Sequence, residues 1–179
     1  MKKNPKTFFL LLLIAPIVFI SSCTKDTAQK ANGDLSATKL GWVTGTWKQT
    51  DIQLAYPIPN PLGGDDLPVG TSLHILAPYL PLTGPKIEAT NNNVFSFDAK
   101  GTYSITGTID YILPNAAATG NWNLQVYGSA LHLVSGDKDT PLWIDKINAT
   151  DMRVGSLSNT IYVAEVDADL PVYYVFKKQ

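Results

Sequence analysis

The stretch TYSITGTIDY, residues 102–111, alternates apolar and polar side chains over ten positions. A period of two is typical of a strand with one buried face and one face in water. The stretch NWNLQV, residues 121–126, shows the same alternation. The side chains expected to point inward are Tyr103, Ile105, Ile109, Tyr111, Trp122, Leu124 and Val126. Gly107 interrupts this face, either to leave space or, as we favour, to let the sheet bend.

Further short strands follow the same pattern along the chain. They are predicted at residues 94–97, 130–134, 142–149, 152–157, 160–166 and 172–176, with polar turns at 98–101 and 135–140. Short strands at such spacing predict an all-β sandwich or barrel built of antiparallel hairpins. Beyond Thr50 we find no convincing helical period. A short helix is predicted at residues 36–40, with Ser36 as its N-cap.

The chain starts with a pattern typical of secretion. Three lysines precede a 13-residue apolar run, residues 8–20, that only Pro16 interrupts. Such a run suits a signal peptide, whereas a membrane-spanning helix needs about 20 apolar residues. Ser21 and Ser22 then precede Cys23, the single cysteine. This resembles the lipobox of bacterial lipoproteins, which implies cleavage after residue 22 and acylation of Cys23. The alternative is an ordinary signal peptide and a free thiol.

A lipid anchor would attach the protein to a membrane. Two or three acyl chains, of the palmitate kind, hold a protein stably on a bilayer, where one chain does not. Residues 23–35 are polar and predict a flexible tether. Thr24 follows the cysteine, and resemblance to bacterial sorting signals then implies the outer membrane. Because three of the 14 basic residues lie in the leader, the remainder is net acidic, and we expect no nucleic-acid partner.

Residues 36–179 are expected to form one domain, and its motifs resemble those of a known family. Gly45 and Trp47 form a G-x-W motif near its start, and FD-x-x-GTY, GNW, LWI and YVFK follow in order at residues 97–103, 120–122, 142–144 and 174–177. This set resembles the lipocalin-like lipoproteins of Bacteroidetes. The resemblance implies an antiparallel up-and-down barrel of about eight strands. It also implies that a basic side chain covers the Trp47 ring, and we expect Arg153 there, although a surface position for Arg153 is the alternative.

A segment rich in proline and glycine, residues 56–92, interrupts the strand pattern. Seven of the 12 prolines lie within residues 56–85. The segment also carries the apolar residues Leu73, Ile75, Leu76, Tyr79 and Leu80, and residues 72–76 are a candidate strand. Long irregular segments in compact domains are often lids or binding loops. Two interpretations stay open, a cover over the barrel mouth and a decoration on the outer wall.

Catalysis finds little support in the sequence. His74 and His132 are the two histidines, and their separation matches no metal motif. Asp65 and Asp66 could form a carboxylate pair, but they are predicted to be solvated turn residues. The acidic residues at 137–139 and 167–169 lack the complete calcium-loop pattern and are predicted to be turns. We therefore expect neither an enzyme nor a cofactor or metal.

Two classes of function remain. The first is a membrane-anchored carrier or sensor that binds a small apolar or amphipathic ligand inside the barrel, on the seven inward side chains named above. The second is an interaction module with a filled barrel, such as an adhesin, an envelope scaffold or a glycan-binding subunit. A protein that inhibits an enzyme through its loops is a third alternative.

Overall fold

The computed structural model describes residues 35–60 and 63–179. The expected signal peptide, Cys23 and nearly all of the expected tether lie outside these residues. Asp34–Gln179 form one compact unit. Among the described residues, none of the helices has the length and apolar character required to cross a bilayer.

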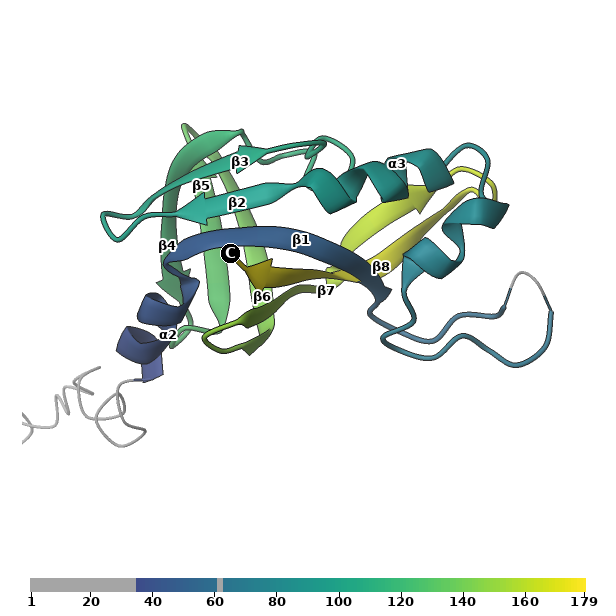
Figure 1. Ribbon diagram of the computed structural model, residues 1–179, viewed down its shortest axis with the longest axis horizontal. Helices are drawn as coiled ribbons and strands as arrows, with labels where there is room; N and C mark the ends of the chain where they lie inside the picture. Colours follow the sequence, from purple (N-terminus) through teal and green to yellow (C-terminus); the bar gives the residue numbers. More distant parts are fainter. Residues whose placement is uncertain (1–34, 61–62) are drawn as a thin grey trace, which may run out of the picture. The chain divides into compact units, whose positions relative to one another are not determined.

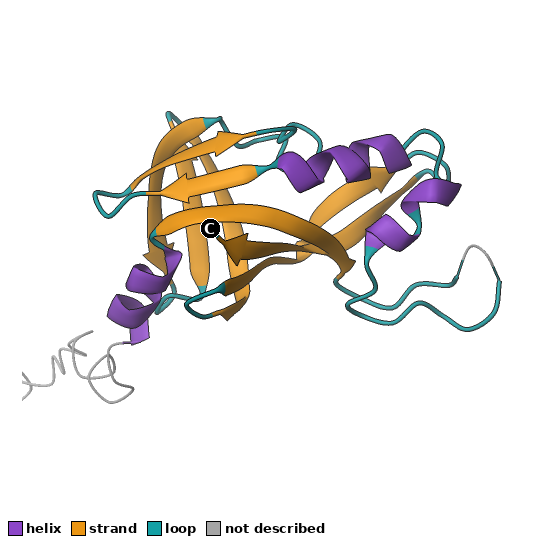
Figure 2. Cartoon of the chain, in the orientation of Figure 1, coloured by secondary structure: helices purple, strands orange, loops and turns teal. Residues whose placement is uncertain are grey.

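Eight strands close into an antiparallel barrel in which each strand pairs with its neighbours in sequence and β1 also pairs with β8 (Figures 1 and 2). The strands are β1 (Gly45–Leu54), β2 (Val94–Phe97), β3 (Thr102–Thr106), β4 (Thr119–Gln125), β5 (Ala130–Ser135), β6 (Lys138–Ile147), β7 (Asp151–Val163) and β8 (Ala168–Lys178). The helical elements are α2 (Leu35–Val43), η1 (Leu73–Ile75), η2 (Ala77–Tyr79), α3 (Gly84–Ala89) and η3 (Thr90–Asn92). The predicted up-and-down barrel of about eight strands is therefore confirmed.

Apolar side chains at alternating strand positions form the barrel core, as the sequence pattern indicates. In β3, Tyr103 and Ile105 are buried while their neighbours are exposed. Aromatic rings from different strands then meet inside. Phe95 and Phe176 lie edge to face with centroids 4.8 Å apart, a favourable arrangement for two quadrupoles. Buried residues from all eight strands belong to one hydrophobic cluster inside the barrel.

Several predicted boundaries were wrong for local reasons. The alternation at residues 102–111 continues past the strand, which ends at Thr106. Gly107 follows with a φ of 113°, and a Cβ there would lie 2.3 Å from the side-chain oxygen of Asn93. That oxygen accepts a hydrogen bond from the Thr108 amide at 2.6 Å. Gly107 therefore allows a close approach at a bend, as we favoured, and opens no space.

The second half of the barrel departs from the prediction in strand length. The two strands predicted at residues 152–157 and 160–166 form the single strand β7, whose pairing with β8 shifts register between Ser156 and Thr160. β6 begins at Lys138, inside the predicted polar turn, and ends at Ile147. The predicted short helix is confirmed as α2, but it begins at Leu35, so Ser36 lies within the helix and is not its N-cap.

The end of the barrel near α2 is closed by Trp47. This side chain has no exposed surface, and its indole N–H donates to the Val43 carbonyl at 2.7 Å. The prediction that Arg153 covers the ring was wrong. The ammonium of Lys178 lies 5.1 Å from the centre of the ring and donates to the Trp42 carbonyl at 3.0 Å. Lys178 pairs directly with Trp47 across β1 and β8, and directly paired residues share one face of a sheet.

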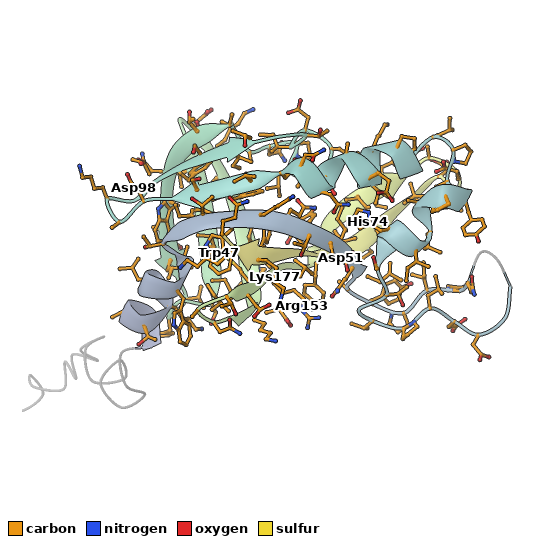
Figure 3. All side chains as sticks on the ribbon, in the orientation of Figure 1. Trp47, Asp51, His74, Asp98, Arg153 and Lys177 are labelled. Atoms are coloured by element: carbon orange, nitrogen blue, oxygen red, sulfur yellow. The ribbon has the colours of Figure 1, made fainter. Side chains whose placement is uncertain are left out.

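Arg153 lies on the outer face instead. It pairs with Val175, whereas its neighbour Met152 is buried. Its guanidinium contacts the Asp145 carboxylate at 2.6 Å and lies 4.9 Å from the centre of the Tyr173 ring. Figure 3 shows Arg153 and Trp47 at separate places on the barrel. Arg153 therefore adopts the surface position that was the alternative.

Residues 71–92, which we call the cover, gather at the end of the barrel opposite α2 (Figure 1). They form three short 3₁₀ turns and α3, contrary to the expectation that no helix follows Thr50. Residues 72–76 were a candidate strand, but only an isolated bridge between Ser72 and Gln53 forms there. The buried cover residues Leu73 and Ile87 belong to the same hydrophobic cluster as the barrel interior. This packing favours the cover interpretation over a decoration of the outer wall.

Candidate functional site

Most of the side chains predicted to line a ligand site inside the barrel belong to its hydrophobic core. Tyr103, Ile105, Ile109 and Trp122 are buried, and Tyr111 and Leu124 are partly buried against the core cluster. The prediction for Val126 was wrong. It lies in the turn after β4 with a φ of 51° and is 54% exposed, because the strand ends one residue earlier.

The tyrosine hydroxyls of this set bond to the backbone. The Tyr111 hydroxyl donates to the Tyr162 carbonyl at 2.9 Å, and the Tyr103 hydroxyl donates to the Ala117 carbonyl at 3.1 Å. Burial, with a smaller contribution from the charge of Glu165, raises the pKa of Tyr111 to about 12, and burial also raises the pKa of Tyr103. These hydroxyls therefore hold neighbouring segments together.

An apolar pocket of about 310 Å³ lies beneath the cover. Three segments contribute to it. The loop after β1 provides Tyr56, Ile58 and Pro59, the cover provides Leu73, Leu76, Leu80 and Ile87, and the β7–β8 hairpin provides Val163, Val166, Ala168, Asp169 and Leu170. Its volume is at the lower end of the range for small-molecule pockets. None of the seven predicted ligand residues lines it.

The pocket has a dry interior and a wet rim. Ile87, Leu73 and Val163 are at most 2% exposed and form its inner wall. Tyr56 and Val166 are about half exposed, and Asp169 is also exposed. Asp169 is the one charged residue among those that line the pocket. The pocket therefore suits a ligand whose apolar part lies inside and whose polar end lies at the rim.

Glu165, in the turn between β7 and β8, fastens the cover over the pocket. One of its carboxylate oxygens accepts the Leu82 amide at 2.6 Å and the Thr83 amide at 2.9 Å. The Thr83 hydroxyl in turn accepts the Ala164 amide at 3.0 Å. Burial alone would raise the pKa of Glu165, but the hydrogen bonds from Thr83 and Leu82 outweigh it and lower the pKa to about 2. The carboxylate is therefore charged at neutral pH and latches the cover to the hairpin.

His74 of the cover contacts two carboxylates, and Figure 3 shows it near one of them, Asp51. One ring nitrogen is 3.4 Å from Glu88 of α3, and the other is 4.0 Å from Asp51 of β1. Asp51 also accepts the Ser72 hydroxyl at 2.6 Å. The cluster joins the cover to the barrel wall. It lacks the geometry of a metal site, since no group of three or more His, Cys, Asp or Glu side chains suited to a metal occurs in the described part of the chain.

The other predicted polar residues stabilise turns and strands. His132 contacts Asp139 across β5 and β6 at 2.9 Å, beside the turn that holds Asp137. Asp167 lies in the β7–β8 turn and accepts the Tyr162 hydroxyl at 2.8 Å. Asp65 and Asp66 are exposed in the loop after β1. The prediction of turns or loops is confirmed for Asp65, Asp66, Asp137 and Asp167. It was wrong for Asp139 and Asp169, which lie in β6 and β8.

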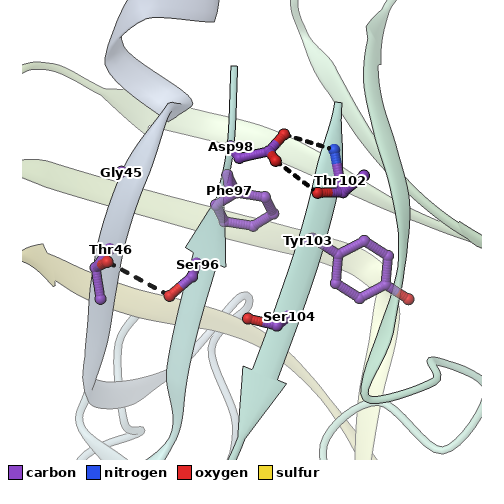
Figure 4. Close-up of a pocket in the computed structure, with 8 residues that line it drawn as sticks. All are labelled: Gly45, Thr46, Ser96, Phe97, Asp98, Thr102, Tyr103 and Ser104. Atoms are coloured by element: carbon purple, nitrogen blue, oxygen red, sulfur yellow. Dashed lines mark hydrogen bonds between the residues drawn. The ribbon is translucent and has the colours of Figure 1, made fainter. Parts of the chain in front are cut away.

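Two other hollows on the barrel are more open. A groove of about 360 Å³ runs over β1, β2 and β3 and includes the predicted residues Gly45 and Tyr103 (Figure 4). Its polar groups already bond to one another. The Asp98 carboxylate accepts the amide and hydroxyl of Thr102, which lower the pKa of Asp98. The groove therefore offers few unused polar groups.

The second hollow, of about 410 Å³, lies between α2 and β4. Two predicted ligand residues, Trp122 and Leu124, line it. Of its lining side chains only that of Trp122 is buried, whereas Leu40 is 48% exposed. A ligand there would therefore lose less contact with water than one beneath the cover. Burial favours the apolar pocket as the candidate site.

Comparisons with known proteins give matches among solved structures. No family model matches the chain, and no curated protein matches it. Among solved structures, a lipocalin-like protein from Bacteroides uniformis matches with 13% sequence identity over 82% of this chain and 100% of that chain, at a TM-score of 0.37. A TM-score this low carries no weight of its own, so the barrel assignment rests on the strand order and register of the chain itself.

Proposed function

We propose that this protein is a lipid-anchored binding protein of the bacterial cell envelope that holds a small apolar or amphipathic ligand. The pocket beneath the cover is the binding site. The protein acts without catalysis, as a carrier or sensor. Its partners are the bilayer, through acylated Cys23, and the ligand.

One observation carries the binding proposal. Buried side chains from three separate segments surround a hollow that is continuous with the hydrophobic cluster, and exposed residues ring its entrance. Largely apolar, concave sites with few polar groups are typical of small-molecule sites. The polar latch at Glu165 and the cluster at His74 join the cover to the barrel, and both are weaker attachments than a continuous strand. Such attachments allow the cover to open for ligand entry.

The affinity expected of such a pocket follows from burial. Each buried CH₂ contributes about 0.8 kcal/mol, so ten of them contribute roughly 8 kcal/mol. The cost of losing translational and rotational freedom reduces this gain. An amphiphile with a chain of about 12 carbons is therefore expected to bind in the micromolar range or more weakly, because about 8 kcal/mol corresponds to about 1 μM.

The experiment that tests binding uses residues 34–179, which form one compact unit. Native mass spectrometry and isothermal titration with 1-dodecanol give stoichiometry and affinity. Ala168 lines the pocket beneath the cover, and Ala168→Trp is expected to block binding. Ala99 lines the hollow beside α2, and Ala99→Trp is expected to leave binding unchanged. Loss of binding in Ala99→Trp alone would place the ligand in the other hollow and contradict the proposal.

The anchor is proposed on the leader and the lipobox-like sequence before Cys23. Expression of the full chain in a bacterium with labelled palmitate is expected to label the protein and place it in the membrane fraction. Cys23→Ser is expected to remove both the label and the membrane association. Labelling that persists in Cys23→Ser would contradict acylation at this thiol.

The cluster of buried side chains inside the barrel favours the second candidate function, an interaction module that works through its outer surface. The two candidates differ in their response to small amphiphiles. A domain that binds no 1-dodecanol and copurifies with no small molecule would favour the module.

A further inference from the structure

We propose that the barrel docks on an anionic bilayer surface through its α2 end, so that the cover faces away from the bilayer that holds the anchor. The inference goes beyond the proposed ligand and rests on the anchor at Cys23. The α2 end consists of α2, the end of β8 and the turns at residues 98–101, 126–129 and 148–150. Because neighbouring strands are antiparallel and β1 begins directly after α2, these turns lie at the same end of the barrel.

Contacts of α2 define this end. The Lys178 ammonium, at the end of β8, donates to the Trp42 carbonyl of α2. Leu40 of α2 and Ala99 of the first turn line one hollow. The chain that leads to Cys23 joins the domain at this end. Its 11 residues, 24–34, reach at most about 40 Å, so the tether brings the α2 end to the bilayer but does not by itself exclude the other end.

Charge distinguishes the two ends of the barrel. Over α2, the last four residues, the three turns and the three residues on either side of each turn, there are six basic and three acidic residues. The basic residues are Lys39, Lys100, Lys146, Arg153, Lys177 and Lys178. The same count over the connections at the other end, residues 55–93, 107–118, 136–137 and 164–167, gives nine acidic residues and two lysines. An anionic surface therefore attracts the α2 end and repels the other.

The acidic side chains at the α2 end are already engaged. Two of the three form salt bridges with basic neighbours, and the third accepts hydrogen bonds from Thr102. Within residues 35–60 and 63–179, none of Lys39, Lys100 and Lys146 forms a salt bridge. Lys100 and Lys146 are exposed, and Lys39 is partly exposed. These three lysines therefore remain for lipid phosphates.

The α2 end also presents large apolar side chains to the surroundings. Leu40, Val126, Tyr127 and Trp143 are 43% to 66% exposed. Trp143 pairs with Ala130, the residue that begins β5 after the turn at 126–129. Trp and Tyr are enriched where proteins meet the head groups of a bilayer. The same end therefore combines free lysines with aromatic side chains suited to that interface.

The cover exposes apolar side chains as well, among them Ile75, Tyr79 and Leu82. It belongs to the acidic end of the barrel, opposite α2 (Figure 1). β7 runs between the two ends with 13 residues, which at about 3.3 Å per residue and a tilt of about 40° spans roughly 30 Å along the barrel. Screening acts over about 10 Å at 0.1 M salt, so the acidic end does not oppose docking by the α2 end. A ligand then enters the pocket from the aqueous side.

The test attaches residues 23–179 to a maleimide lipid in vesicles through Cys23, the single thiol of the chain, so that it does not depend on acylation. The vesicles contain phosphatidylcholine with or without phosphatidylglycerol. Labelling with an amine-reactive ester and peptide mass spectrometry then give the reactivity of each lysine. The anionic lipid is expected to lower the reactivity of Lys39, Lys100 and Lys146 severalfold and to leave that of Lys86 and Lys138 unchanged. High salt is expected to remove this protection.

Two double variants carry matched changes of charge. Lys100→Gln with Lys146→Gln is expected to lower the ratio of docked to undocked domain about 30-fold, or about 2 kcal/mol at 1.4 kcal/mol per tenfold. This change removes the protection of Lys39. Lys86→Gln with Lys138→Gln, two exposed lysines at the other end, is expected to keep it.

The outcomes separate this inference from the proposed ligand site. Protection of Lys86 and Lys138 in place of the three lysines at the α2 end would overturn the orientation and put the cover on the bilayer. Equal reactivity of every lysine with and without the anionic lipid would overturn the docking. Protection of Lys39 that survives Lys100→Gln with Lys146→Gln would overturn the role of charge. Each of these results leaves the binding of 1-dodecanol to the pocket as a separate question with its own test.

Discussion

Replacement of Ile87 by alanine tests whether the cover is part of the folded core. Ile87 lies in α3, has no exposed surface and belongs to the hydrophobic cluster of the barrel. The change removes three carbon atoms, and about 0.8 kcal/mol for each gives a loss of roughly 2.4 kcal/mol. A cavity term adds to this in a closed core, but Ile87 already borders the pocket, so the added term is small. Alanine's higher helix propensity returns a few tenths of a kcal/mol.

The free energy of unfolding is therefore expected to fall by about 2–3 kcal/mol, measured by urea denaturation of residues 34–179. Ile75→Ala is the matched control, because Ile75 is in the same cover but is 66% exposed. Its effect is expected to stay within about 0.5 kcal/mol. Equal and small losses in both variants would refute the packing of the cover against the barrel.

Two further predictions concern the closed end and the latch. Lys178→Met is expected to shift the Trp47 indole N–H resonance in ¹⁵N NMR and to cost about 0.5–2 kcal/mol, since it removes the cation over the ring. Arg153→Met is expected to leave that resonance in place. A shift in Arg153→Met but not in Lys178→Met would instead support the prediction from sequence that Arg153 covers the Trp47 ring. The pKa of Glu165 is lowered from 4.5 to about 2, so its stabilisation of the cover is complete above about pH 4.5 and is lost as the pH falls towards 2. In the native protein, hydrogen exchange of the Leu82 and Thr83 amides, corrected for intrinsic rates, is expected to accelerate as the pH falls over that range. Glu165→Gln is expected to remove this pH dependence. Exchange rates of the native protein that do not change with pH would contradict the latch.

The barrel could be predicted because its strands obey local rules. Val94–Phe97 alternates intermediate and buried side chains and forms β2 with the predicted bounds. Longer-range features were less accessible. The contact between Lys178 and Trp47 depends on the register between the first and last strands, which are more than 100 residues apart in sequence. The G-x-W motif identified the ring but could not identify its partner.

The place of the candidate pocket could not be predicted from the sequence. Leu73, Leu76 and Leu80 stood out in the sequence as apolar residues in a segment rich in proline and glycine. α3 is only six residues long and buries the side chain of Ile87 on one face, too little for a helical period to be recognised. The alternation in β3 and β4 correctly predicted inward side chains such as Ile105 and Trp122. It could not show whether those side chains surround a cavity or fill it, because packing depends on all strands together.

The most direct test of the account is a methyl NMR titration of residues 34–179 with 1-dodecanol. The account predicts that the methyl resonances of Leu80, Val163 and Val166, which line the pocket, shift in a saturable manner. The methyl resonances of Leu131 and Leu133, buried in β5, are expected to move little. Saturable shifts confined to Leu40 and Leu124 beside α2, or no saturable shift at any methyl group, would contradict it.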